Sequence, residues 1–551
     1  MSAASARAET LARLAREQFD LLVIGGGING AGIARDAALR GLRVALVEKE
    51  DFASGTSSRS SRLVHGGVRY LEHGHFHLVF ESSRERRTLL DIAPHLVRPL
   101  EFTWPVYAGA RVPRWKLAAG LMLYDVLALF RNVAVHRRLG ARDVAGREPA
   151  LRRDGLTGGA SYYDAATDDA RLTLANAIGA AEAGAVVANH VAVRALVRGA
   201  GVARGARAED VLASHGGGGP TIDITALITV NATGPWSDEL RRLEDPGAAA
   251  SVRGTKGVHV AVPRERIGNR GALTLLSPID GRVTFVLPAG PRHTIVGTTD
   301  TATDVEPGEV RATREDVEYL LRTANAYFPD AHLHPDDVVS AWAGIRPLVA
   351  SGYGGAGDAA SASREHAIAR GPSGVITISG GKLTTYRAMS AEVVDTVCRT
   401  LGRSGTASTQ ARALPGGDLR SPARETDAAR QALGAARAAA AEWLVGAYGS
   451  RWRAVWALAE SDRALAAELS PGLPYIAAEL VYGVTREMAC TLGDLLIRRT
   501  HLAFETRDHG AAAAAAAAAI VAPVAGWDDD EIARQLAAYE RESVRIFAVD
   551  Q

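Results

Sequence analysis

Residues 19–48 read FDLLVIGGGINGAGIARDAALRGLRVALVE, and this stretch decides the fold. A continuous apolar run of strand length, 19–24, enters a glycine-rich turn at 25–30, and a segment with helical periodicity follows the turn. A second apolar run, 42–47, closes on Glu48. A dinucleotide-binding βαβ unit has the same order of elements: a strand, a glycine turn, a helix, a second strand and an acid at its end. We therefore predict such a unit here.

The residues of this turn have separate predicted tasks. Gly25 permits the tight turn, Gly27 lets the backbone approach a pyrophosphate, and Gly30 lets the helix pack closely on the strand. Asn29 lies in the same turn, where the first N–H groups of the helix face the phosphates. Glu48 lies close to the expected offset of about 20 residues for an acid that binds ribose hydroxyls, and it disfavours a 2′-phosphate. All five residues are expected in the cofactor site.

A hydroxyl-rich loop and a pair of glycines follow this unit. The hydroxyl groups are short hydrogen-bond donors, and the glycines expose the backbone beside a large planar ligand. This favours a permanently buried flavin over a nicotinamide, which must bind and dissociate in each cycle. The residues expected to face the cofactor here are Thr56, Ser57, Ser58, Ser61, Gly66 and Gly67.

Three long strings stand out in the chain: GGGINGAG (25–32), TSSRSSRLVHGGVRY (56–70) and GGKLTTYR (380–387). They resemble the signatures of one family, the FAD-dependent glycerol-3-phosphate dehydrogenases. Three further strings are similar to the substrate-domain motifs of that family: KGVH (256–259), GTTD (297–300) and GIRPL (344–348). The resemblance extends over about residues 18–395, with the motifs in family order.

The resemblance implies a mixed α/β fold with a glutathione-reductase-type FAD-binding Rossmann domain, an antiparallel-sheet substrate domain and a C-terminal helical domain. Period-2 runs between 251 and 350 independently predict the antiparallel sheet, and helical spacing after 424 predicts the helices. The oxidoreductase region is expected at 18–400, with a linker at 401–424 and the helical domain at 425–551. Within this region, the FAD domain is expected at about 18–110, 160–250 and 340–400. The inserted substrate domain is expected at about 70–160 and 250–345.

The resemblance also adds residues to the expected cofactor site. In this type of flavoprotein, strands such as those within 186–197 return to the adenine side of the cofactor. A buried strand at 226–230 then leads into a second close approach of the backbone, and the glycine turn at 380–381 opens a helix. The added residues are Val191, Ala232, Gly234, Trp236, Gly381, Lys382, Leu383 and Thr384.

Oxidation of a secondary alcohol by a flavin requires a group that takes the hydroxyl proton and an anchor for the rest of the substrate. The resemblance implies that His259 is the base and that Arg346 stabilises the developing alkoxide. For sn-glycerol 3-phosphate the anchor must hold a dianion, which guanidinium and ammonium groups bind. The expected substrate-binding residues are Arg69, Tyr70, Arg364 and Lys382.

The family resemblance implies oxidation of glycerol 3-phosphate to dihydroxyacetone phosphate, with electrons passed from FAD to a membrane quinone. A second hypothesis keeps the flavin but uses oxygen, as a glycerol-3-phosphate oxidase or as an oxidase of amines or amino acids. Clustered cations favour a phosphate over an amine. A third hypothesis is a catalytically silent flavoprotein scaffold, which predicts the loss of His259, Arg346 or the cations; all of them are present.

Composition narrows the class of protein. The chain has 551 residues, enough for two or three domains, and a formal net charge of +1 that provides no field for nucleic acid. Cys398 and Cys490 stand far apart, which predicts two reduced thiols. His73, His75 and His77 alternate, but their rings would share a face only on a strand, and the next residues are helical. We expect neither a nucleic-acid partner nor a metal.

The family resemblance implies peripheral contact with a membrane. No window reaches the roughly 18 consecutive apolar residues of a membrane span, and the N-terminal segment lacks the apolar core of a secretory signal. Segment 111–138 is apolar and helical with basic ends, which suits either a bilayer interface or burial against the protein. With the resemblance, we expect a cytoplasmic enzyme at the inner face of the cytoplasmic membrane.

The sequence does not determine the oligomeric state, and a homodimer is possible. The alanine run at 511–519 predicts a low-complexity helix or linker.

Overall fold

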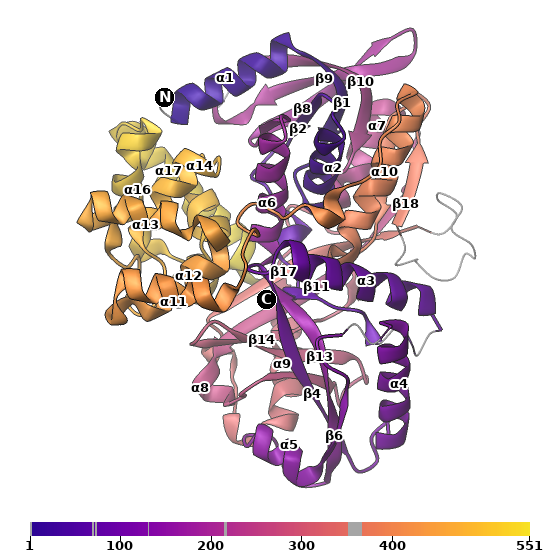
Figure 1. Ribbon diagram of the computed structural model, residues 1–551, viewed down its shortest axis with the longest axis vertical. Coiled ribbons are helices and arrows are strands. Elements are labelled where there is room, and N and C mark those ends of the chain that lie inside the picture. Colours follow the sequence, from indigo (N-terminus) through magenta and orange to yellow (C-terminus); the bar gives the residue numbers. More distant parts are fainter. Residues whose placement is uncertain (1–2, 69–70, 72–73, 130–131, 214–217, 351–365) are drawn as a thin grey trace.

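The computed structural model describes residues 3–68, 71, 74–129, 132–213, 218–350 and 366–551. Two large β-sheets divide most of the chain between them, and a body of helices lies against one side of both (Figure 1). In Figure 1 the first sheet is in the upper half, the second sheet in the lower half and the helical domain on the left. This is the three-part mixed α/β fold that the sequence predicts.

The first sheet is built on the predicted βαβ unit. Its central strands are buried on both faces, and their sequences are therefore continuous apolar runs rather than alternating ones. The strands are β1 (Gln18–Ile24), β2 (Val44–Val47), β7 (Val186–Ala188), β8 (Val191–Gly199), β9 (Val202–Asp210), β10 (Thr221–Asn231), β18 (His366–Arg370) and β19 (Ile376–Gly380). They follow the order β18-β19-β10-β1-β2-β7, with the hairpin β8–β9 attached to β10.

Helices cover both faces of this sheet. They are α1 (Ala3–Arg16), α2 (Ile28–Leu39), α6 (Asp169–Glu182) and α10 (Tyr386–Leu401). Leu21 and Val23 of β1 share a buried apolar cluster with α2, α6 and α10, whereas Leu22 and Ile24 point to the opposite face and share a cluster with Leu14 of α1. The alternation along β1 therefore fixes which helices lie on which side.

The parallel strands of the first sheet bring the predicted cofactor residues to one edge. β1 pairs in parallel with β2 and β10, and β10 pairs in parallel with β19. Gly25, Glu48, Ala232 and Gly381 each follow the carboxyl end of one of these strands closely. This is the edge at which open parallel sheets bind their ligands.

The second sheet is mostly antiparallel, as the alternating strands between 251 and 350 predict. Its strands are β3 (Leu63–Val64), β4 (Val97–Tyr107), β5 (Arg137–Gly140), β6 (Leu156–Thr167), β11 (Val252–Pro263), β12 (Ala272–Leu276), β13 (Val283–Ala289), β14 (His293–Gly297), β15 (Thr301–Ala302) and β17 (Ser340–Val349). The long pair β4–β6 joins this sheet through β12, so residues 97–107 lie with the substrate-side strands. Helices α5 (Ala141–Arg147), α8 (Arg264–Ile267) and α9 (Arg314–Tyr327) share its apolar core.

Two helices lie at the edge of the second sheet, on the right of Figure 1. They are α3 (Phe76–Ile92) and α4 (Arg114–Leu127), and they contact each other. Helix α4 occupies part of the segment 111–138 that the sequence marks for either a bilayer interface or burial.

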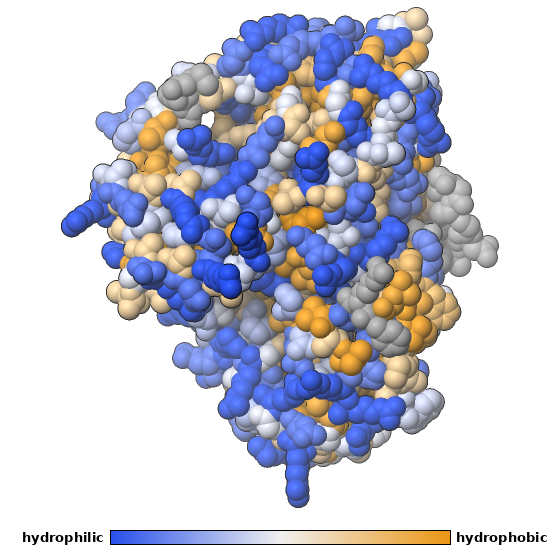
Figure 2. All heavy atoms as spheres, in the orientation of Figure 1, coloured by the Kyte–Doolittle hydropathy of each residue, from blue (hydrophilic) through white to orange (hydrophobic). Residues whose placement is uncertain are grey.

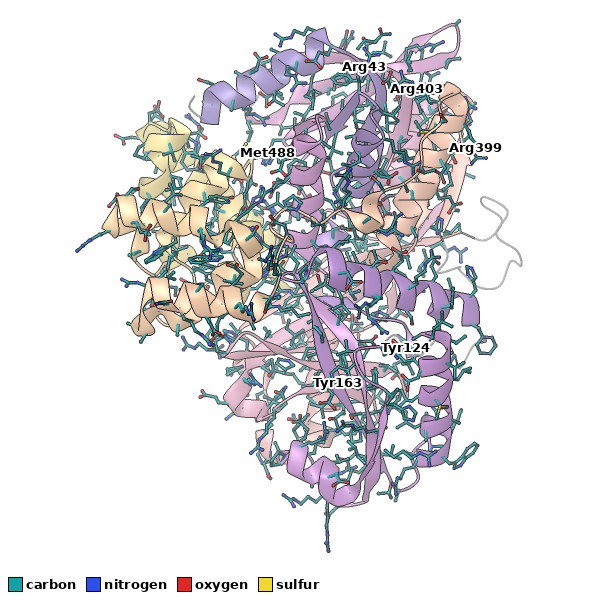
Figure 3. The ribbon with its side chains drawn as sticks, viewed as in Figure 1. Arg43, Tyr124, Tyr163, Arg399, Arg403 and Met488 are labelled. Atoms are coloured by element: carbon teal, nitrogen blue, oxygen red, sulfur yellow. The ribbon has the colours of Figure 1, made fainter. Side chains whose placement is uncertain are left out.

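The helical domain contains α11 (Pro422–Leu433), α12 (Ala438–Tyr448), α13 (Trp452–Ser461), α14 (Ala477–Arg486), the π-helix Asp494–Arg499, α15 (Leu502–Glu505), α16 (Ala511–Ala525) and α17 (Asp529–Phe547). The alanine run is therefore part of a helix, α16. The domain meets the first sheet near Met488, whose carbonyl accepts a hydrogen bond from the Asn189 amide at 3.0 Å (Figure 3). Beyond α17, strand β20 (Val549–Asp550) pairs in parallel with β16 (Ala312–Thr313) in a separate two-stranded sheet, and this ties the domain to the segment that leads into α9.

Candidate active site

A cavity of about 660 Å³ lies between the carboxyl edge of the first sheet and the second sheet. Segments far apart in the sequence line it, including 54–57, 232–236 and 380–384. The residues predicted from the sequence that line the cavity are Gly25, Gly27, Asn29, Glu48, Thr56, Ser57, Ser61, Gly67, Val191, Ala232, Gly234, Trp236, His259, Arg346, Gly381, Lys382, Leu383 and Thr384. The fold thus brings together most of the expected site.

The turn after β1 leaves its backbone open to a ligand. Gly25 has a φ of +109°, and a Cβ there would lie 2.6 Å from the carbonyl oxygen of Ala232. Gly27 is the N-cap residue of α2 and, as a glycine, has no side chain of its own to cap the helix. Ser57 accepts a hydrogen bond from the N–H of Ile28 at 3.0 Å. The start of α2 therefore points its dipole at the cavity, which fits the pyrophosphate of a dinucleotide.

Glu48 lies at the carboxyl end of β2 and lines the cavity. Its carboxylate accepts hydrogen bonds from the N–H of Gly26 at 2.6 Å and from the N–H of Glu50 at 2.9 Å. Burial raises the pKa of Glu48, and these two donors act against that rise. An acid held in this position fits the ribose hydroxyls of a dinucleotide.

Three predicted cofactor residues lie behind the lining of the cavity. A Cβ on Gly30 would lie 1.8 Å from the carbonyl oxygen of Gly25, so Gly30 serves the close packing of helix on turn that the sequence predicts. Ser58 is buried. Gly66 makes room for another side chain, because a Cβ there would lie 2.1 Å from the phenol oxygen of Tyr124. The geometry gives Gly30 and Gly66 packing roles.

His259 lies on the second-sheet wall of the cavity. The pairing of β11 with β17 places it opposite Trp342, and the two rings stack with centroids 5.5 Å apart. Its Nε2 is 2.8 Å from the hydroxyl oxygen of Ser61. Burial lowers the pKa of His259 to about 3, and the charges of Arg346 and Arg62 act in the same direction. The ring is therefore neutral near pH 7, and one of its two nitrogens is an acceptor.

Arg346 extends over the same wall and is held by the loop that contains the GTTD string. One guanidinium nitrogen donates to the Thr298 hydroxyl at 3.0 Å and to the Thr299 carbonyl at 3.1 Å. The other donates to the Asp300 carboxylate at 3.2 Å. A Cβ on Gly257 would lie 2.4 Å from this guanidinium, which explains the glycine of the KGVH string. The charge at Arg346 is thus fixed in place beside His259.

The remaining predicted substrate residues cannot all be placed. Lys382 lines the cavity in the loop between β19 and the short helix Leu383–Thr385. Arg69, Tyr70 and Arg364 lie outside the residues that the structure describes. Their assignment to the phosphate of the substrate stays a prediction.

Asp164 is a residue of the cavity that the sequence reasoning did not single out. It accepts hydrogen bonds from the N–H of Gly66 at 2.9 Å and from the hydroxyl of Tyr124 at 2.6 Å, and it forms an ion pair with Arg86. Figure 3 shows Tyr124 on α4 beside β6, the strand that carries Tyr163 and Asp164. The available signal was an acid inside a strand that is otherwise largely apolar.

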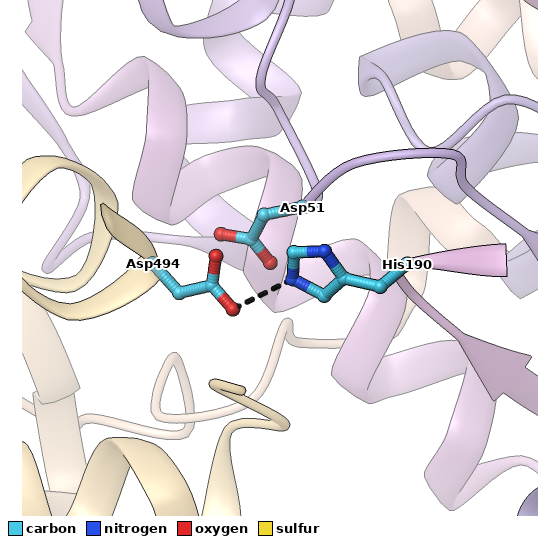
Figure 4. Close-up of side chains that lie close together, drawn as sticks. All are labelled: Asp51, His190 and Asp494. Carbon is cyan, nitrogen blue, oxygen red and sulfur yellow. Dashed lines mark hydrogen bonds and ion pairs between the residues drawn. The ribbon is translucent and has the colours of Figure 1, made fainter. Parts of the chain in front are cut away.

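A network of charges joins the helical domain to the loop that follows Glu48. Asp51, His190 and Asp494 lie close together, with His190 Nε2 2.9 Å from the Asp494 carboxylate (Figure 4). Arg498 and Arg499 both contact Asp51, at 2.7 and 2.6 Å. Because two guanidinium groups already neutralise these carboxylates, the cluster acts as a buried ion-pair network between domains.

Two protein-family models match the chain. One is described as FAD dependent oxidoreductase and matches residues 20–387. The other is described as the C-terminal domain of alpha-glycerophosphate oxidase and matches residues 407–532. Together they cover the two sheets and most of the helical domain.

Individual proteins show the same similarity. Glycerol-3-phosphate dehydrogenase 2 of Mycobacterium tuberculosis (strain ATCC 25618 / H37Rv) is 39% identical over 543 residues, which is 97% of this chain and 89% of that protein. The X-ray structure of the glycerol-3-phosphate dehydrogenase from Bacillus halodurans complexed with FAD is 33% identical, covers 99% of this chain and 98% of its own, and gives a TM-score of 0.80. L-alpha-glycerophosphate oxidase from Mycoplasma pneumoniae with FAD bound shares the fold over 71% of this chain and 97% of its own, at 18% identity and a TM-score of 0.55.

Proposed function

Because the chain belongs to the family of FAD-dependent glycerol-3-phosphate dehydrogenases, with FAD as its cofactor, we propose that it oxidises sn-glycerol 3-phosphate to dihydroxyacetone phosphate. The observation that carries the proposal is the neutral, buried His259 beside Arg346 on the second-sheet wall of the cavity. One group is suited to take a hydroxyl proton and the other to stabilise the developing alkoxide.

The first sheet provides the residues that would hold FAD. Glu48 is proposed to bind the ribose hydroxyls and the first turn of α2 the pyrophosphate, which is supported by their position in the lining of the cavity. Bound in this cavity, FAD supplies the acceptor for the hydride that leaves the carbinol carbon of the substrate.

The second sheet provides the groups for the alcohol. His259 accepts the hydroxyl proton at Nε2, the nitrogen that lies 2.8 Å from the Ser61 hydroxyl. Arg346 donates to the substrate oxygen as negative charge develops on it, and its contacts to the 298–300 loop hold it ready. Lys382, together with Arg69, Tyr70 and Arg364, is proposed to bind the phosphate.

Anaerobic reduction of the purified flavoprotein tests this assignment. Glycerol 3-phosphate should bleach the bound flavin rapidly, and a soluble quinone should restore its colour faster than oxygen does. Reoxidation mainly by oxygen would identify an oxidase. If glycerol 3-phosphate leaves the bound FAD oxidised, the proposed substrate is wrong.

The low pKa of His259 predicts how its contribution to stability changes with pH. Burial is the main cause of the shift of the His259 pKa to about 3, whereas a histidine in an unfolded chain has a pKa of about 6.5. The unfolded state therefore binds a proton first as the pH falls, and stability is lost from about pH 6.5 downwards. Relative to H259Q, the native protein should lose about 1.4 kcal/mol between about pH 7.5 and 5.5. Urea unfolding of both proteins at the two pH values measures this difference, and an unchanged difference would contradict the buried neutral ring.

We further propose that electrons pass to a membrane quinone and that the enzyme contacts the inner face of the cytoplasmic membrane through α3 and α4. Among the helices in the described ranges, none is long and apolar enough to cross a bilayer. Figure 2 shows apolar side chains gathered on the right-hand side, where α3 and α4 meet. The exposed apolar residues of this patch, called the α4 patch below, are Phe76, Phe80, Trp115, Met122, Leu123, Val126, Leu129, Val133 and Val135.

The α4 patch has the features of an interfacial surface. Trp115 is 74% exposed and Met122 is 49% exposed, while Leu117 and Leu121 of the same helix are buried against the second sheet. Basic residues flank the exposed face, including Arg114 and Lys116. An exposed apolar face with basic neighbours binds the surface of an anionic bilayer.

The double variant W115S/L123S tests the membrane contact. Because both side chains are exposed, we expect the fold to persist and sedimentation with vesicles of anionic phospholipid to fall by about tenfold or more. V202S, which removes an exposed apolar side chain from the distant hairpin β8–β9, should bind like the native protein. Equal binding by all three proteins would exclude the α4 patch as the contact surface.

A further inference from the structure

The loop that follows Glu48 is held in place by the C-terminal helical domain. Arg545 of α17 forms two hydrogen bonds with the Glu50 carboxylate, at 2.7 and 3.1 Å. Arg498 and Arg499 of the π-helix bind Asp51, the next residue of the same loop. The carboxylates of Glu50 and Asp51 are therefore both paired with arginines of the helical domain, which lie more than 400 residues later in the chain.

The same loop positions the carboxylate of Glu48. The N–H of Glu50 donates to Glu48 at 2.9 Å, so the residue that Arg545 holds also orients the acid placed for the ribose. On the other side, the carbonyl of Glu50 accepts the N–H of His190 at 2.8 Å, and the carbonyl of Glu48 accepts the N–H of Val191 at 2.7 Å. A continuous chain of contacts thus runs from α17 to the cavity.

Burial makes this connection costly to break. The side chains of Arg498 and Arg499 are 3% and 1% exposed, and that of Asp51 is fully buried. Separation of the helical domain would leave buried charges without their counter-ions. At the rim of the network, burial alone would raise the pKa of Glu50, but Arg545 lowers it to about 2, and the pair is ionised near neutral pH.

Other charged groups around Glu50 do not replace Arg545. Arg498 and Arg59 lower the pKa of Glu50 through their charges, but neither has a hydrogen bond to its carboxylate in the part of the chain that the structure describes. Glu542 lies one turn before Arg545 on α17 and is bound by Arg498 at 2.7 Å. Arg545 is therefore the cation that holds Glu50 directly.

We propose that docking of the C-terminal helical domain and binding of the adenosine end of FAD are coupled through Arg545, Glu50 and Glu48. A docked domain fixes the loop and so pre-positions the acid for the ribose. By reciprocity, bound FAD stabilises the docked domain to the same extent. The proposal depends on FAD as the cofactor and is independent of the alcohol that the enzyme oxidises.

Titration of deflavinated protein with FAD tests the coupling. R545M keeps the aliphatic contacts of the side chain and removes the bonds to Glu50, and its Kd for FAD should rise by about 5- to 50-fold. R541M is the matched control, because Arg541 lies exposed one turn away on the same helix and should leave the Kd unchanged. Equal values for R545M and R541M would overturn the proposal.

Two further measurements separate coupling from a folding defect. E50Q should raise the Kd in the same direction, and the double variant R545M/E50Q should bind FAD no more weakly than the weaker single variant, because both changes break one link. FAD should also slow tryptic cleavage at the exposed Arg420, just before α11, and at Arg424 in its first turn, in the native protein and in R541M. Additive effects in the double variant would show that Arg545 and Glu50 do not act through one link. Equal protection by FAD in R545M would show that docking of the domain does not depend on Arg545. Either result would overturn the proposal.

Discussion

H259Q is expected to reduce its flavin about 10²- to 10⁴-fold more slowly than the native protein at saturating glycerol 3-phosphate. The reason is that His259 is a buried, neutral ring on the wall of the cavity, and glutamine keeps a similar shape without accepting the proton. Anaerobic stopped-flow spectroscopy measures the rate directly. The visible spectrum of the bound flavin shows whether the variant still binds FAD.

A second histidine provides the control for this variant. His293 is also buried in the second sheet, on β14, but it does not line the cavity. H293Q should therefore reduce its flavin at the native rate. If H259Q stays within about threefold of the native rate while binding FAD, the proton is taken by another group and the proposed role of His259 is wrong.

R171M is expected to destabilise the protein by about 3–5 kcal/mol. Arg171, on α6 of the first sheet, bonds both carboxylate oxygens of Glu487 at 2.6 and 2.9 Å and lies over the ring of Tyr448 at 4.1 Å. Both members of the pair are almost completely buried. Methionine leaves the buried charge of Glu487 without the guanidinium that binds both of its carboxylate oxygens. Denaturant unfolding followed by tryptophan fluorescence measures the loss.

The double variant R171M/E487M separates the buried charge from the packing. It removes both charges, and its stability should recover most of what R171M loses. R194M breaks an ion pair with Glu209 in which the arginine is 58% exposed, and should cost less than about 1 kcal/mol. A loss in R171M no larger than in R194M would show that the link between α6 and the helical domain adds little to stability.

The parts of the fold that the sequence predicts correctly are those with a local signature. The spacing of the apolar and glycine residues within 19–40 predicts a strand, a turn and a helix. The structure has β1 and α2 there. His259 and Arg346 lie 87 positions apart and line one cavity because strands β11 and β17 pair with each other. Motif strings marked both residues, although their roles in catalysis stay predictions.

Other features depend on partners that no local pattern names. The role of Gly66 in making room for Tyr124 becomes visible only when α4 packs against β6. Asp164 enters the cavity through the same packing, and a strand pattern alone does not distinguish a buried functional acid from an edge residue. The ion pair of Arg545 with Glu50 joins two ordinary surface residue types across the chain, so composition and periodicity carry no trace of it.

The separation of Glu50 and Arg545 along the chain also determines the interval between their synthesis on the ribosome. They are 495 positions apart, and at about 5–20 residues per second a ribosome needs about 25–100 s to pass from one to the other. During synthesis the βαβ unit therefore exists long before the arginines that brace its loop. On the proposed coupling, the loop that orients Glu48 gains its support only after α17 has emerged, and a nascent chain released before position 498 carries Asp51 with neither of its arginines. A chain truncated before α17 should therefore bind FAD more weakly than the complete chain.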